Sequence, residues 1–182
     1  MTRRIRLDLH THPVEALRET LGIKGIRDIN SNVAGSIVQA VKSAGLDGLA
    51  ITERENFNHG WVACLEILEH FKTEKLICLA GAEIEFQGEY YLQIYIPPYL
   101  RGRIPFFQNK EWFVILTHPG YFNTWDSQSS PALFDAVEEQ SVRGKFDLAR
   151  DIAARNGVPS IRSSAAHKLE DIGAFWTELE MK

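Results

Sequence analysis

Cysteine is scarce in this chain of 182 residues, and the two that it has, Cys64 and Cys78, stand apart in apolar surroundings. Two isolated thiols favour buried, reduced cysteines over a disulfide or a cysteine-rich metal site. The sequence also lacks an apolar run near the ~20 residues of a membrane span, and its start lacks the apolar core of a signal peptide. These absences predict a cytoplasmic protein with no membrane partner.

Dense blocks of basic residues are also missing. The formal net charge is −4, and the hydrophobic and charged fractions of 45% and 24% are ordinary for a globular protein. A nucleic-acid partner is therefore not expected. The length suffices for one full core, and no repeat or linker divides the chain. We predict a single domain over residues 1–182, while the oligomeric state stays open.

Apolar strand-like runs alternate with helical patterns along the chain. Strands are expected near residues 5–7, 46–52, 76–80, 90–96, 112–116, 133–137 and 158–161, and helices near 33–44, 60–71, 145–155 and after 167. Ser31 or Asn32 is expected to cap the helix near 33–44, after a long loop over 14–31 with one short helical turn. This alternation predicts a parallel α/β fold. A closed barrel is favoured over an open sheet, because candidate ligands follow several strands and no Gly-x-Gly-x-x-Gly turn follows the first.

The motif His10-Thr11-His12 follows the first expected strand. Side chains alternate along a strand, so two histidines one residue apart point to the same side and can reach one metal ion. This motif is common by chance. It gains weight because other metal-binding residue types also follow strand-like runs, namely Glu83, His118 and His167.

Short motifs lie in order along nearly the whole chain, at residues 8–12, 49–54, 80–85, 115–120, 134–138 and 163–173. This ordered set resembles the motifs of the polymerase and histidinol phosphatase (PHP) family. The resemblance implies a distorted TIM-like barrel of seven βα units with up to three metal ions. Members of that family hydrolyse phosphomonoesters, remove nucleotides as exonucleases, or have no assigned substrate.

The sequence departs from the family pattern at two positions. Arg54 stands where the family has a histidine ligand, and Ala165 stands where it has an aspartate. We therefore expect about one divalent transition metal per chain (zinc, manganese or iron) rather than three. The expected ligands are His10, His12, Glu83 and His118.

Three further residues are expected to act in catalysis, namely Arg54, Arg162 and His167. The arginines would bind phosphate oxygens. Two alternatives remain open: Arg54 forms a plain ion pair with Glu83, and His167 caps a short helix. Asp8 or Glu85 would orient an imidazole, Glu15 is a further possible ligand, and the adjacent Glu138 and Glu139 are interpreted as a rim pair without chemistry.

These residues favour a metal-dependent phosphoesterase that uses metal-bound hydroxide on a small phosphorylated substrate, a phosphomonoester. Two other hypotheses remain. One is a metallohydrolase acting on a bond without phosphorus. The other is a barrel that has lost catalysis and binds a ligand or a protein.

Overall fold

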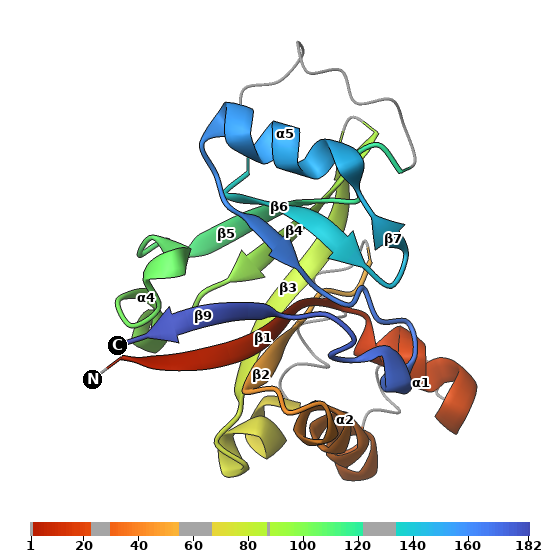
Figure 1. Ribbon diagram of the computed structural model, residues 1–182. Helices are drawn as coiled ribbons and strands as arrows, with labels where there is room; N and C mark the ends of the chain where they lie inside the picture. Colours follow the sequence, from red (N-terminus) through yellow and green to blue (C-terminus); the bar gives the residue numbers. More distant parts are fainter. Residues whose placement is uncertain (1, 23–29, 55–66, 87, 122–133) are drawn as a thin grey trace.

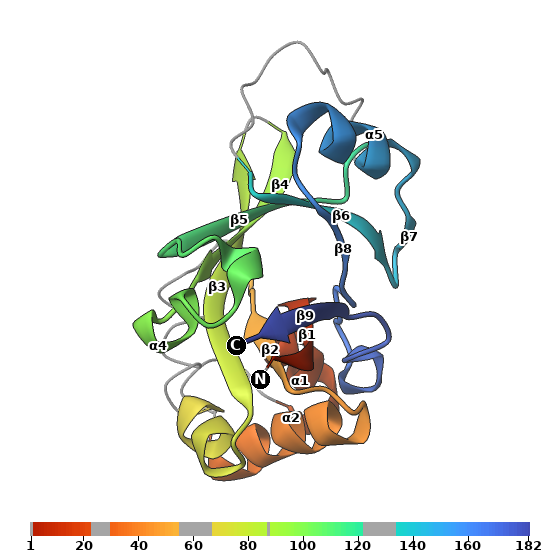
Figure 2. The ribbon, with the colours of Figure 1, turned by 60° about the vertical axis from the view of Figure 1, so that its left-hand side comes forward.

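The computed structural model describes residues 2–22, 30–54, 67–86, 88–121 and 134–182. They form a nine-stranded sheet in the order β7-β6-β5-β4-β3-β2-β1-β9, with β8 paired to β6 outside this path. The sheet curls strongly, and the longer helices lie on its outside (Figures 1 and 2). The strands are β1 (Arg3–Thr11), β2 (Gly48–Ile51), β3 (Ile77–Phe86), β4 (Glu89–Tyr95), β5 (Trp112–Thr117), β6 (Ala136–Ser141), β7 (Gly144–Lys145), β8 (Ser160–Arg162) and β9 (Thr177–Met181).

The expected barrel-like α/β fold is confirmed as a curled half-barrel, but the sheet is mixed rather than parallel. β1, β2 and β3 are parallel to one another, whereas β4 is antiparallel to both β3 and β5. Only residues 87 and 88 separate β3 from β4. A parallel connection needs a crossover of about a dozen residues, so this short turn forces β4 to reverse. The longer link from β4 to β5 holds only the short helices α4 (Pro98–Arg101) and η2 (Pro105–Phe107).

The segment that follows β8 completes the curl beside β1. The backbone N–H of His12 donates to the Ala166 carbonyl at 2.9 Å, and a single bridge pairs Thr11 with Ala166. The chain then returns in β9, which lies antiparallel to β1 and which the sequence analysis did not predict. The segment after β8 therefore lies directly against the end of β1, where the histidine motif begins.

The longest helices within the described residues are α1 (Pro13–Leu21), α2 (Ser31–Ser43) and α5 (Asp147–Asn156). The short helical turn predicted around residues 14–21, within the loop expected over 14–31, is the full helix α1. The cap of α2 is Asn30 rather than Ser31 or Asn32. Asn30 Oδ1 accepts hydrogen bonds from the backbone N–H groups of Asn32 and Val33, at 3.0 and 3.2 Å. Of the helix expected at 60–71, the described part is helical over 67–73. The expected last helix is the short η3 (Leu169–Asp171).

Apolar side chains fill both faces of the sheet. The inner cluster includes Leu7, Leu79, Ile94, Phe113 and Ile161. On the outside, α2 packs against β2 and β3, and α5 packs against β5 and β6. None of the described helices is long and apolar enough to cross a bilayer.

Candidate metal centre

His10 and His12 lie at the carboxyl end of β1. The β1–β2 pairing is irregular between Asp8 and Thr11, and such an irregularity re-aims the side chains beside it. His10 Nε2 lies 3.1 Å from His12 Nε2, and both rings are fully buried. The two histidines of the motif therefore meet, as the spacing predicts.

The Glu83 carboxylate of β3 contacts three imidazoles. Its Oε1 lies 3.4 Å from Nε2 of His10 and 3.4 Å from Nε2 of His118, and its Oε2 lies 3.6 Å from Nε2 of His12. His118 follows β5 in a left-handed backbone conformation, with φ of 49°, which histidine adopts more readily than most residues. The structure thus brings the four expected metal ligands to one buried place.

The spacing of these atoms fits a divalent transition metal. Zinc binds imidazole nitrogen and carboxylate oxygen at ~2.0–2.2 Å in a tetrahedron, so ligand atoms at neighbouring corners lie about 3.3–3.6 Å apart. The contacts between the ring nitrogens and with Glu83 are 3.1, 3.4, 3.4 and 3.6 Å. In particular, His10, His12 and Glu83 form a group that can hold one ion. The same donors suit manganese and iron(II).

Glu138 of β6 belongs to this centre, so its interpretation as a rim residue without chemistry was wrong. The side chain is fully buried. Its Oε1 accepts from His10 Nδ1 at 2.9 Å and from Ser163 Oγ at 2.6 Å, and its Oε2 lies 3.1 Å from His118 Nδ1. A carboxylate on the far nitrogen of an imidazole orients the ring and directs its other nitrogen. Glu138 therefore aims Nε2 of two histidines toward Glu83.

Burial and charge set the protonation of the cluster. Burial lowers the pKa of His10, but the charges and hydrogen bonds of Glu138 and Glu83 together outweigh burial and raise this pKa to about 10. Burial lowers the pKa of His12 well below its usual value, and the charge of His10 lowers it further. Burial would raise the pKa of Glu83 and of Glu138, but their histidine contacts hold both below the usual range. Without a metal, the proton therefore lies on His10.

Arg54 follows β2 and forms an isolated bridge with the backbone of Glu83. Its Nε donates to Glu83 Oε2 at 3.1 Å, while its side chain stays 43% exposed. The ion pair that the sequence left as an alternative is present. Since part of the guanidinium faces solvent, Arg54 can also meet an anion that approaches Glu83.

His167 lies beside the cluster. Its ring stacks on that of His12, with centroids 4.4 Å apart. Its Nδ1 lies 3.2 Å from Glu15 Oε2, and its Nε2 accepts from an Nη of Arg143 at 2.7 Å. The pKa of His167 lies below its usual value, chiefly because the ring is partly buried. A neutral ring with its proton on Nδ1 satisfies both contacts, and Arg143 is a second cation at the site that the sequence analysis missed.

Glu15 also lies within reach of another carboxylate. Together with His12 and Glu53 it forms a group whose ligand atoms are close enough to hold a metal. Burial raises the pKa of Glu53 to about 7, and one of its oxygens accepts from the backbone N–H of Val14 at 2.7 Å. Because that oxygen already serves the start of α1, we assign Glu53 to the local structure.

Two predicted roles are not supported by the placement of the side chains. Asp8 accepts from the backbone N–H of Ser164 and of Gly173, each at 2.9 Å, so it ties the C-terminal segment to β1 instead of orienting an imidazole. Glu85 is exposed.

The structure does not bring Arg162 to the cluster. Its neighbours Ile161 and Ser163 point inward, to the inner core and to Glu138 respectively. Alternation along β8 therefore points Arg162 to the outer face, where it lines a hollow with Glu139. Arg143, from the turn between β6 and β7, lies beside the cluster through its contact with His167.

Comparisons with known proteins concern the family and the fold of the chain. The sequence model of the PHP-associated family matches residues 145–182. A search of curated protein sequences finds no significant match.

Solved structures give matches to the fold at low identity. A two-domain protein from Bacteroides vulgatus, described as containing a predicted PHP-like metal-dependent phosphoesterase, matches with a TM-score of 0.60 and 16% identity over 92% of this chain. The chain spans 53% of that protein. The protein PsfC from Pseudomonas syringae matches with a TM-score of 0.62 and 15% identity, over 97% of this chain and 82% of PsfC. A protein from Bifidobacterium adolescentis, proposed to be a metal-dependent phosphoesterase, matches with a TM-score of 0.57 and 15% identity. The match covers 94% of this chain and 92% of that protein. The chain therefore has a PHP-like fold, with a PHP-associated segment at residues 145–182.

Proposed function

We propose that the protein is a metal-dependent phosphoesterase that hydrolyses a small phosphomonoester. The observation that carries this proposal is the convergence of three imidazoles on the buried Glu83 carboxylate, with Arg54 and Arg143 on the flanks. A divalent metal held by His10, His12, Glu83 and His118 would supply Lewis-acid activation of a water molecule at neutral pH.

The two arginines would recognise the phosphoryl group. A guanidinium binds two phosphate oxygens at once and keeps its charge at all relevant pH values. Arg54 contacts Glu83 directly, and Arg143 is positioned through His167, which Glu15 in turn orients. We assign His167 a positioning role, because both of its ring nitrogens already have partners on the protein.

One observation favours a second candidate. The Arg54 guanidinium already neutralises one oxygen of Glu83, so an arginine can replace a metal as the partner of this carboxylate. A PHP-like barrel that holds an arginine there would bind an anionic ligand without turning it over. This candidate predicts anion binding that does not depend on added metal.

An assay of the purified chain separates these functions. Phosphomonoesters, phosphodiesters and amides are offered with manganese, zinc or iron(II), to the wild type and to the double variant His10→Ala with His12→Ala. The matched control is His70→Ala, since His70 is a half-buried histidine outside the cluster whose Nε2 lies 2.9 Å from Ser31 Oγ.

We expect slow phosphomonoester turnover that the double variant loses and the control keeps. Turnover of amides alone would favour the metallohydrolase that acts on a bond without phosphorus. If no substrate is turned over in a way that the double variant abolishes, the binding function replaces the enzyme.

A further inference from the structure

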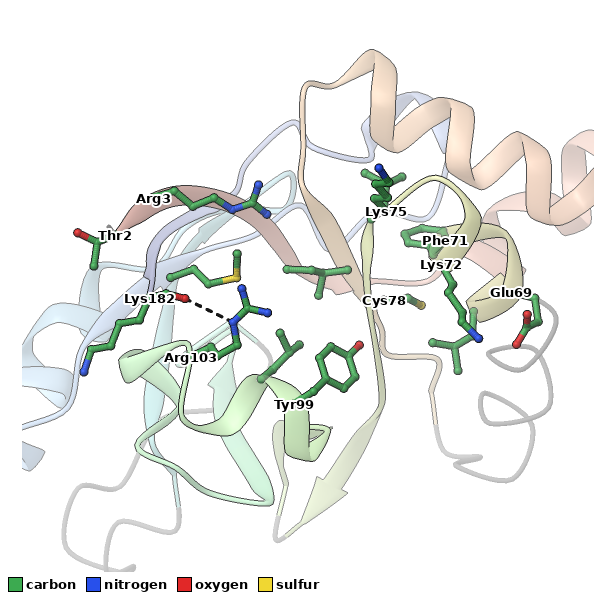
Figure 3. Close-up of a pocket in the computed structure, with 15 residues that line it drawn as sticks. Thr2, Arg3, Glu69, Phe71, Lys72, Lys75, Cys78, Tyr99, Arg103 and Lys182 are labelled. Atoms are coloured by element: carbon green, nitrogen blue, oxygen red, sulfur yellow. Dashed lines mark hydrogen bonds between the residues drawn. The ribbon is translucent and has the colours of Figure 1, made fainter.

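A second hollow lies at the opposite end of the sheet from the metal centre. A cavity of about 1120 Å³ opens between the amino ends of β1 and β3, the helical turn over 67–73, α4 and the end of β9 (Figure 3). Arg3 lines this cavity, and His10 lies seven residues along the same strand. Seven strand residues span roughly 23 Å, so the two sites are separate.

Cationic side chains dominate the rim of the cavity. The cations that line it are Arg3, Lys72, Lys75, Arg103 and Lys182, and among the described lining residues only Glu69 has a carboxylate side chain. The whole chain has a net charge of −4, so the positive charge around this cavity is opposite in sign to that of the chain as a whole. Among the described residues, neither Lys72 nor Lys75 forms an ion pair within 4.0 Å, and both are exposed. Their charges are therefore available to a ligand.

The cavity also offers apolar surface. The half-buried Leu68 and Leu76 contribute accessible surface to its wall, and the buried Phe71 and Leu100 lie behind it. The Tyr99 ring is 60% exposed and extends from α4 toward Cys78 of β3 (Figure 3). An exposed aromatic ring beside apolar walls and a cationic rim suits a molecule with an apolar body and a negative group.

We propose that this cavity binds a small organic anion with an apolar or aromatic body. The apolar part would lie against Tyr99 and Leu76, while the negative group would meet Lys72 and Lys75. An anion without an apolar body would leave the aromatic surface in water, and a neutral aromatic would leave the lysines unused. Both parts are therefore needed for full affinity, which gives the proposal its test.

The test uses anilinonaphthalene sulfonate, whose fluorescence rises in apolar surroundings and which carries one negative charge on an aromatic body. Its neutral analogue N-phenylnaphthylamine has the aromatic body without the charge, and inorganic phosphate has negative charge without an apolar body. Titrations compare the wild-type chain with the double variant Lys72→Glu with Lys75→Glu. The matched control is Lys145→Glu with Arg155→Glu, since these two exposed cations lie at β7 and the end of α5, away from the cavity.

We expect saturable binding of the sulfonate at one site, weakened about tenfold or more by charge reversal at Lys72 and Lys75 and unchanged in the control. The neutral analogue should bind more weakly than the sulfonate and respond little to either double variant. Far-ultraviolet circular dichroism checks that each variant is folded, and Tyr99→Ala should weaken the sulfonate independently of charge.

Three results would overturn the proposal. One is equal affinity of both double variants for the sulfonate, and another is equal affinity of the wild type for the charged and neutral dyes. The third is co-sedimentation with phosphatidylglycerol vesicles that charge reversal at Lys72 and Lys75 abolishes, because it would assign the basic rim to a lipid surface. Failure of the phosphatase assay leaves this test intact, since the two sites share no residue.

Discussion

Glu138 Oε1 lies 2.9 Å from His10 Nδ1, and the other oxygen of the same carboxylate lies 3.1 Å from His118 Nδ1. One buried side chain thus sets the direction of two candidate metal ligands. His10 Nδ1 donates to this carboxylate, and the ring of His118 also turns Nδ1 toward it, so the Nε2 atoms of both rings face Glu83.

The first prediction concerns Glu138→Gln. The amide has one acceptor, which His10 and Ser163 share, and its NH₂ group then faces His118 Nδ1. That contact demands the other tautomer of His118, with a proton on Nε2. We expect metal affinity to fall about 10- to 100-fold, measured by calorimetric titration. The matched control is Glu139→Gln, because Glu139 faces outward to Arg150 and Ser160; equal losses in both variants would contradict the orienting role.

The second prediction concerns the metal itself. We expect about one tightly bound transition metal per chain, measured by elemental analysis of protein purified without chelator. Replacing Glu83 with Gln should lower occupancy strongly, since this carboxylate contacts three imidazoles. Close to three equivalents in the wild type, or none after reconstitution, would count against the single-metal proposal.

The third prediction compares two arginines. Arg143→Ala should lower kcat/KM for a phosphomonoester about 10- to 100-fold, because a hydrogen bond to a charged group contributes roughly 1.5–3 kcal/mol. Arg162→Ala should leave kcat/KM within about twofold, since that side chain lies on the outer face. A larger loss in the Arg162 variant would reverse the assignment.

The fourth prediction concerns Arg54 and Ala165, the two positions at which the sequence departs from the PHP pattern that it resembles. Ala165 has a left-handed backbone with φ of 52°, which aspartate tolerates better than alanine does. The double variant Arg54→His with Ala165→Asp should therefore fold and bind more metal per chain than the wild type. The single variant Arg54→His serves as its control. An unchanged metal content in the folded double variant would mean that the site differs from the family at more than these two positions.

The fifth prediction concerns pH and the metal-free protein. The pKa of His10 rises from 6.5 to about 10 in the folded chain, chiefly through Glu138 acting against burial. A raised pKa stabilises the fold fully below pH 6.5, and this contribution disappears as the pH rises through about 10. The free energy of unfolding, measured in urea, should therefore fall between pH 7 and pH 10, on the order of a few kcal/mol. Glu138→Gln should flatten this dependence; an equal fall in both proteins would assign it to other groups.

The alternation of side chains between the two faces of a strand explains which site residues could be predicted from sequence. The His10 and His12 motif and Glu83 follow apolar runs, so their common location could be predicted. Glu138 and Glu139 are adjacent acids on one strand, and nothing local says which of them faces inward. The inward Ala136 of the same strand decides this only once the fold is known.

Long-range contacts explain the rest. Arg143 comes from a tight turn and reaches His167 only because β6 and the segment after β8 lie side by side. The reversal of β4 could have been suspected from the short link at residues 87–88. The alternation of Leu179 and Met181 with exposed glutamates likewise signals β9. The single-domain organisation stays a prediction.

The antiparallel pairing of β1 and β9 determines how the chain responds to a pulling force. Arg3 pairs with Met181, and the pairing continues inward to Leu7 with Thr177, so the start of β1 lies beside the end of β9. Tension applied to the two ends would load these bonds one after another, as in opening a zipper, rather than all together. After Leu7 the next ties are those of Asp8 to Ser164 and Gly173, and then comes His10. Stretching would therefore reach the histidine cluster after only a few bonds have opened.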